Sequence, residues 1–179
     1  MLVEDPQFLA SETRMELWEN LEEYLFTFVE LGDRYSELLD GSPLVRHLWM
    51  GGSYVSSKLN PNDIDIVVFV DGKAEELLRA SAFNNGQRGR KVKNDAKWLT
   101  RAFNRRRMQK EFKLDPHMLS YRPVPNSFSL QDDQIDERKY FEQRGMFDDW
   151  LQRCSPDGEK VAATEESAKQ RRGYLEVQL

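Results

Sequence analysis

The residues best suited to chemistry lie in one short segment, MGGSYVSSKLNPNDIDIVVFVD. Gly51, Gly52 and Ser53 follow an apolar stretch there, and a glycine without a Cβ atom lets the backbone approach a ligand closely. The backbone N–H groups after the glycines, with the serine hydroxyl, are suited to holding phosphate oxygens. Asp63 and Asp65 lie two positions apart in a predicted strand, so both carboxylates project from one face. Paired carboxylates of this kind bind Mg²⁺.

This arrangement resembles the signature of the polymerase-β-like nucleotidyltransferase superfamily. In that pattern a Gly-Ser pair is followed about ten residues later by Asp-x-Asp, as Gly52-Ser53 is followed by Asp63 and Asp65. The resemblance covers roughly residues 44–119. The chain is also similar to an uncharacterised bacterial and phage branch of the superfamily, in which PNDID follows the Gly-Ser loop.

The superfamily pattern includes a third carboxylate from a later strand, and Asp115 in FKLDPHML matches it. Pro116 follows directly and is expected to restrict this strand to an edge or a strand end. The proline is also a reason why the Asp115 side chain could turn off the sheet face, and Glu111, which has the same parity, is then the alternative. His117 shares the predicted face of Asp115, and two interpretations stay open for it: contact with a substrate phosphate, or an ordinary surface position.

The resemblance implies a magnesium-dependent enzyme that transfers a nucleoside monophosphate from a nucleoside triphosphate, with ATP the first candidate, to an acceptor hydroxyl. Two Mg²⁺ ions would be held by three carboxylates: Asp63, Asp65 and Asp115. The triphosphate would be bound by the loop residues: Gly51, Gly52, Ser53 and Lys58. The acceptor is left open between a nucleic acid end, a small molecule and a protein side chain. The small size is similar to that of minimal nucleotidyltransferases that act as antitoxins, so a toxin–antitoxin or phage-defence setting is one expectation. The alternative is a catalytically silent module of the same fold that binds protein or RNA.

The elements that must position these residues can be predicted from periodicity and turn signals. Helices are expected at 11–31, 33–40, 73–83, 91–108 and 134–153. Strands are expected at 44–50, 63–70, 111–119 and in the terminal GYLEVQL. The fold class is therefore α/β (α+β), with a small mixed sheet flanked by helices and an amphipathic helix at the N-terminus.

The 179 residues are expected to form a single domain, consisting of a helical extension at 1–41, a core at 44–119 and a helical part at 120–179. Twenty aromatic residues, in a composition that is 39% hydrophobic, exclude an intrinsically disordered chain. A single cysteine excludes a disulfide framework and a cysteine-based zinc site. No apolar run is long enough for a membrane span, and we expect a cytoplasmic protein.

Charge is unevenly distributed along the chain. Residues 1–40 carry eleven acids and two bases, whereas residues 88–110 carry ten bases and one acid. Both segments can be solvated faces, or one can lie against the other. The acidic N-terminal helix is also a candidate docking surface for a protein partner, and the basic segment is a candidate contact for RNA or other phosphates.

Overall fold

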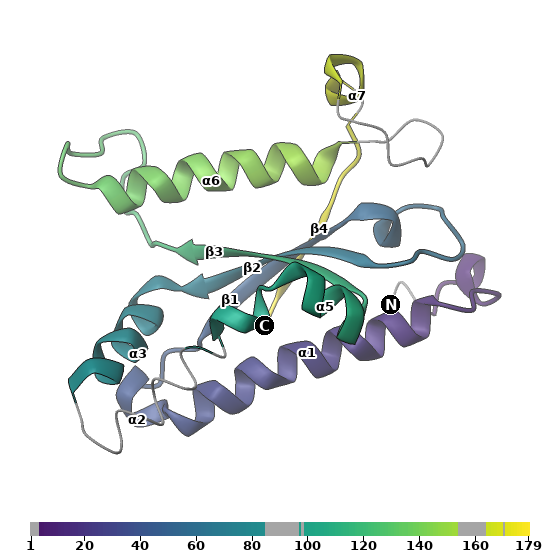
Figure 1. The fold of residues 1–179 in the computed structure, drawn as a ribbon. Helices are drawn as coiled ribbons and strands as arrows, with labels where there is room; N and C mark the ends of the chain where they lie inside the picture. The colour runs from purple at the N-terminus through teal and green to yellow at the C-terminus, as the bar shows by residue number, and fades with distance from the viewer. Residues whose placement is uncertain (1–3, 85–96, 98, 154–163, 170) are drawn as a thin grey trace.

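The computed structural model describes residues 4–84, 97, 99–153, 164–169 and 171–179 (Figure 1). It confirms an α/β fold built on a four-stranded mixed sheet, in which the strands lie in the order β3-β2-β1-β4. The strands are β1 (Val45–Gly51), β2 (Ile64–Asp71), β3 (Leu114–Tyr121) and β4 (Leu175–Gln178). The predicted terminal strand is confirmed, and it pairs with β1 from the far end of the chain.

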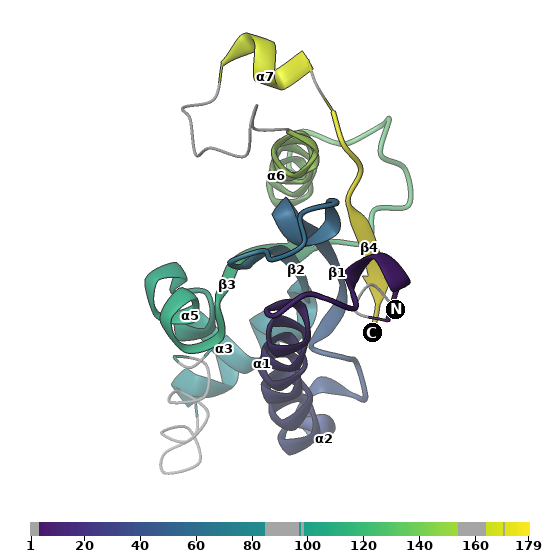
Figure 2. The ribbon, with the colours of Figure 1, turned by 90° about the vertical axis from the view of Figure 1, so that its right-hand side faces the viewer.

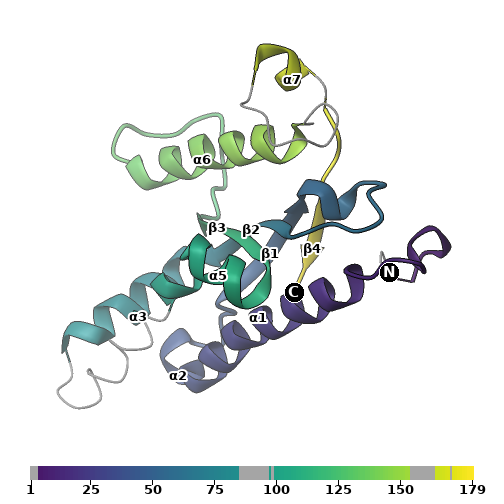
Figure 3. The same cartoon turned by 45° about the vertical axis from the view of Figure 1, so that its right-hand side comes forward.

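Helices cover both faces of this sheet, but unequally. Figure 2 shows α1, α2, α3 and α5 below the sheet and α6 directly above it, with α7 farther from the sheet on the same side. The α-helices are α1 (Arg14–Arg34), α2 (Ser36–Leu39), α3 (Gly72–Asn84), α5 (Arg105–Phe112), α6 (Ile135–Gln152) and α7 (Glu165–Lys169). Residues 97 and 99–102 are also helical, and two 3₁₀ turns lie at Pro6–Phe8 and Gly52–Val55. Figure 3 shows α7 above α6, and the chain leading into β4 passes the end of α6 on its way down to the sheet.

The central strand β2 is buried on both faces, which explains its nearly continuous apolar sequence. Ile64, Ile66 and Val68 belong to the large core under α1, α2, α3 and α5. Val67 and Phe69 alternate with them and belong to a smaller core under α6. The alternation places the odd-numbered residues of β2 on the α6 side of the sheet.

The strand pairing fixes which residues meet across the sheet. Strands β1 and β2 are antiparallel, and Gly51 lies opposite Asp65. Strands β2 and β3 are parallel, and Asp65 lies opposite Asp115. Because β3 is an edge strand, Pro116 is accommodated without interrupting a central ladder, as the sequence predicted.

Some predicted boundaries are wrong for local reasons. Helix α1 continues through Gly32 and ends at Arg34. The predicted strand 111–119 begins only at Leu114, because residues 111 and 112 are the last turn of α5 and Lys113, with φ of 54°, closes that helix. No described helix is both long and apolar enough to cross a membrane.

The predicted basic helix 91–108 is only partly testable, since residues 85–96 and 98 lie outside the described residues. The described part is not one continuous helix. It is interrupted at positions 103 and 104, and the Asn104 side chain accepts a hydrogen bond from the Arg107 N–H to start α5. An Asx side chain at this position favours a new helix start over continuation.

Candidate functional site

Three strand ends meet at one edge of the sheet, and they carry the residues of the candidate site. The last residue of β1, Gly51, is paired with Asp65 near the start of β2. Asp65 is paired in turn with Asp115 near the start of β3. Because neighbouring residues in register project to the same face, both carboxylates lie on the α6 side of the sheet. Pro116 therefore does not turn Asp115 off the face, and Asp115 lies beside Asp65 on the adjacent strand.

Gly52 lies directly against the Asp65 carboxylate. A Cβ atom placed on Gly52 would be 1.8 Å from Asp65 Oδ2, and the backbone φ of Gly52 is +70°. Both facts require glycine, since other residues rarely adopt this φ. The same backbone turn that begins the 3₁₀ segment Gly52–Val55 thus lies in contact with a carboxylate of the candidate site.

The first glycine of the pair has a different neighbour. A Cβ atom on Gly51 would lie 2.5 Å from Leu151 Cδ2 of α6. The missing side chain therefore lets α6 pack closely over the end of β1. This contact places α6 next to the candidate site.

The remaining predicted residues lie on the connection between β1 and β2. Ser53 is half-buried, and its carbonyl accepts hydrogen bonds from the Ser56 N–H (3.2 Å) and hydroxyl (2.7 Å). The Lys58 side chain is exposed, and Asp63 is half-buried just before β2. All three residues therefore lie in the segment that connects the end of β1 to the start of β2.

A buried arginine of α1 holds this loop in place. Arg14 is 1% exposed, and its guanidinium donates hydrogen bonds to four carbonyl oxygens of the loop. These acceptors are Tyr54 (2.6 Å), Ser56 (2.9 Å), Lys58 (2.7 Å) and Leu59 (3.3 Å). Burial lowers the pKa of Arg14 from its ordinary value, and this lowering is opposed by the nearby Tyr54.

The same guanidinium lies over the Phe8 ring, 3.6 Å from its centre. The N-terminal helix therefore positions the loop of the candidate site. Sequence reasoning missed this role, although Arg14 is one of only two bases in the acidic first forty residues.

Arg105, the first residue of α5, forms an ion pair with the Asp115 carboxylate. Its Nε and Nη2 donate to the two carboxylate oxygens of Asp115 in a bidentate pair. This hydrogen bonding raises the pKa of Arg105, and the charges of Asp115 and Asp65 add to the effect. The guanidinium is therefore close to both aspartates and compensates their negative charge.

Glu111, the alternative third carboxylate, is not part of the site. It lies in α5 rather than in a strand, and it forms an ion pair with Arg107 at 2.8 Å one turn earlier. The expectation that it shares a strand face with Asp115 is wrong, because the alternating pattern of residues 111–119 includes the last turn of a helix. Asp115 is the carboxylate that lies next to Asp65.

His117 is half-buried beneath α6 rather than a surface residue. Its ring centre is 4.7 Å from that of Trp150 and 5.2 Å from that of Phe147. Burial and the neighbouring Arg105 lower the pKa of His117, and Asp115 opposes this shift. Its buried Nε2 is 4.0 Å from Asp115 Oδ1 and has no hydrogen-bond partner within the described structure. The imidazole therefore favours its neutral form.

The carboxylates differ from a preformed metal centre. Among the described residues, no group of three or more His, Cys, Asp or Glu side chains is arranged to hold a metal ion. Carboxylate oxygens in register on adjacent strands are the ligand type that Mg²⁺ prefers, but Arg105 already holds one of the two carboxylates. A cation could use Asp115 only after this pair opens.

Comparison with known proteins gives one finding. A family model described as "Family of unknown function (DUF6932)" matches residues 3–178, and no nucleotidyltransferase family was matched. Neither the curated proteins nor the solved structures contain a match. The match spans nearly the whole chain, and the chain therefore belongs to DUF6932, a family of unknown function.

Proposed function

We propose that the chain is a magnesium-dependent nucleotidyltransferase. It would transfer a nucleoside monophosphate from a nucleoside triphosphate to an acceptor hydroxyl and release pyrophosphate. The observation that carries the proposal is the pairing of Asp65 with Asp115 on adjacent parallel strands, with Gly52 packed against the Asp65 carboxylate. This places a glycine turn and two carboxylates together, as phosphoryl transfer by positioning and charge neutralisation requires.

The residues divide into two roles under this proposal. Asp63, Asp65 and Asp115 would hold Mg²⁺, which neutralises charge on the phosphates. The loop would bind the β- and γ-phosphates through the backbone of Gly51–Ser53 and the exposed Lys58 ammonium. In the transfer, the acceptor oxygen attacks the α-phosphorus, pyrophosphate leaves with the electrons of the broken P–O bond, and the hydroxyl proton passes to Asp115.

Arg105 has a defined place in this scheme. Its pair with Asp115 neutralises a carboxylate that would otherwise be close to another, and two such carboxylates repel each other. Mg²⁺ and Arg105 therefore compete for Asp115. When the cation binds, the guanidinium is released beside the phosphates, where an arginine is a strong ligand.

The test is calorimetric binding of ATP, GTP, CTP and UTP in the presence and absence of Mg²⁺. We expect at least one triphosphate to bind only with Mg²⁺, and we expect Asp63→Asn/Asp65→Asn to abolish that binding. Glu16→Gln, which changes an exposed carboxylate on α1, is the matched control and should bind normally. A folded wild type that binds no triphosphate with Mg²⁺ refutes the proposal. Where binding is found, pyrophosphate release is measured next with hydroxyl-bearing acceptors.

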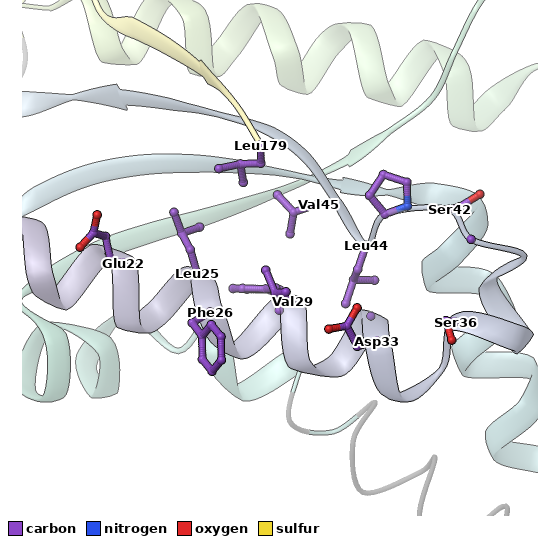
Figure 4. A pocket seen from close by; sticks show the side chains of 14 residues that line it. Glu22, Leu25, Phe26, Val29, Asp33, Ser36, Ser42, Leu44, Val45 and Leu179 are labelled. Atoms are coloured by element: carbon purple, nitrogen blue, oxygen red, sulfur yellow. The ribbon is translucent and has the colours of Figure 1, made fainter. Parts of the chain in front are cut away.

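A second candidate function, a module that binds another protein, has an observation of its own. A groove of about 610 Å³ lies along α1, between that helix and β1 (Figure 4). Its lining is mostly apolar, including Leu25, Phe26, Val29 and Leu44, and Phe26 is 58% exposed. Glu22 and Asp33 are the charged residues of that described lining. Apolar and acidic surface together suit a basic amphipathic helix from a partner.

This second candidate is tested with a designed helical peptide that has leucines at three- and four-residue intervals on one face and lysines on the opposite face. Fluorescence anisotropy should show binding that Phe26→Ser weakens and that Met15→Ser, an exposed change elsewhere on α1, does not. A glutamate version of the peptide is the charge control. Equal binding of the two peptides, or no effect of Phe26→Ser, removes this candidate.

A further inference from the structure

A second cavity lies beside the carboxylates, between β3 and α6. Its volume is about 390 Å³, within the range typical of small-molecule sites. It is lined by Arg105, His117, Met146, Phe147, Asp149, Trp150 and Arg153. Arg105, which lines the cavity, also contacts Asp115, so the cavity adjoins the carboxylates.

The wall of this cavity is aromatic. The rings of Phe147 and Trp150 both lie against His117, whose ring is held at 4.7 Å from Trp150 and 5.2 Å from Phe147. Trp150 is half-buried, so part of its indole remains accessible. An accessible indole with a fixed neighbour provides a flat surface on which a planar ring can stack.

The rim of the cavity carries two arginines and one carboxylate. Arg105 lies on the side of Asp65 and Asp115, and Arg153 is the residue directly after α6. Asp149 also lines the cavity, but its carboxylate is already hydrogen-bonded to Arg153 and Arg171. The cavity therefore combines a stacking surface with two guanidinium groups, each of which is paired with a carboxylate: Arg105 with Asp115 and Arg153 with Asp149. A nucleotide would stack its base on the aromatic surface and bring its phosphates to these guanidinium groups.

We propose that this cavity binds the nucleoside part of the triphosphate, with the base stacked on Trp150 and the triphosphate directed past Arg105 toward Asp65 and Asp115. The proposal rests on the proposed function for the position of the triphosphate. It adds the residues that would distinguish a nucleotide from inorganic polyphosphate. A purely apolar ligand is a poorer fit, because two arginines stand at the rim.

The experiment compares ATP with inorganic tripolyphosphate by calorimetry with Mg²⁺. We expect ATP to bind the wild type more tightly, and we expect Trp150→Ala to weaken ATP about 5- to 150-fold, the effect of losing one base–aromatic stack. Trp150→Ala should leave tripolyphosphate binding unchanged. Trp18→Ala, a change on α1 on the other side of the sheet, is the matched control and should leave ATP binding unchanged. Trp150→Phe keeps a stacking ring and should retain most of the affinity.

The outcomes separate this inference from the proposed function. Equal affinity for ATP and tripolyphosphate, lost in Asp63→Asn/Asp65→Asn, overturns the nucleoside cavity and leaves the transferase proposal standing. ATP binding that depends on Trp150 but not on Mg²⁺ supports the cavity and refutes the transferase. Equal ATP affinity of Trp150→Ala and wild type overturns the inference, and a folded wild type that binds neither ligand overturns both. Circular dichroism of each variant confirms that it is folded.

Discussion

Replacing Arg14 by methionine should destabilise the protein far more than replacing an exposed arginine. Methionine keeps most of the apolar stem but removes a guanidinium that donates to four loop carbonyls. The Tyr54 carbonyl is buried, and leaving it without a donor costs about 1–3 kcal/mol. The other three carbonyls are only partly buried and can turn to water, at about 0.5–1 kcal/mol each.

The expected total is a loss of about 2.5–6 kcal/mol in the free energy of unfolding, a large part of the 5–15 kcal/mol that is typical of a domain. Urea unfolding followed by tryptophan fluorescence measures it. The matched control is Arg107→Met, which removes an exposed pair with Glu111 one helical turn away and should cost about 0.5 kcal/mol. Hydrogen exchange should also increase at residues 52–59 in Arg14→Met alone.

Equal destabilisation by the two substitutions would refute this reasoning. It would mean that the loop carbonyls find water or other donors without Arg14. A large loss of stability with unchanged exchange at residues 52–59 would also contradict it, because the arginine would then stabilise the protein without holding the loop.

Three further predictions follow from the site. Gly52→Ala places a Cβ atom on the Asp65 carboxylate and should destabilise by more than about 2 kcal/mol in urea unfolding, whereas Gly41→Ala, with similar φ but open space, should cost only about 1 kcal/mol. Arg105→Gln frees Asp115 and should tighten Mg²⁺ binding in calorimetry; unchanged affinity would show that the metal does not use this carboxylate. His117, and His47 of β1, which stacks on Phe69, have a pKa lowered from 6.5, chiefly by burial, so protons bind more readily to the unfolded chain. Their contribution to stability is complete above pH 6.5 and is lost as the pH falls below it, and NMR titration of the two imidazoles should give values under 6.5.

The sequence predicted the central strand and its two aspartates because local features are enough for both. The run DIDIVVFV is β-branched, apolar and bounded by turns, and it forms β2 with one boundary residue of difference at each end. The glycine turn was recognisable for the same reason. The terminal strand was also predicted from its own residues, although its partner, β1, was not.

Contacts between distant segments account for what the sequence could not provide. The register of Asp115 with Asp65 depends on a crossover through α3 and α5, which no local pattern determines. The pair between Arg105 and Asp115 could not be recognised from the sequence, because Arg105 is one of ten bases within residues 88–110 and nothing local distinguishes it from the others. The aromatic cavity had a weak signal in the sequence, because Phe147 and Trp150 lie three positions apart on α6, a helix that also carries other apolar residues.

The late position of β4 in the chain has a consequence for biosynthesis. Strand β1 is complete at Gly51, but the partner on its outer edge is Leu175–Gln178, so this edge stays open until residues 175–178 have been synthesised. An open strand edge is a template for pairing with other chains. Nascent or truncated chains that end before β4 are therefore expected to associate through β1, and the four-residue strand would act as the closing step that makes the folded chain resistant to aggregation.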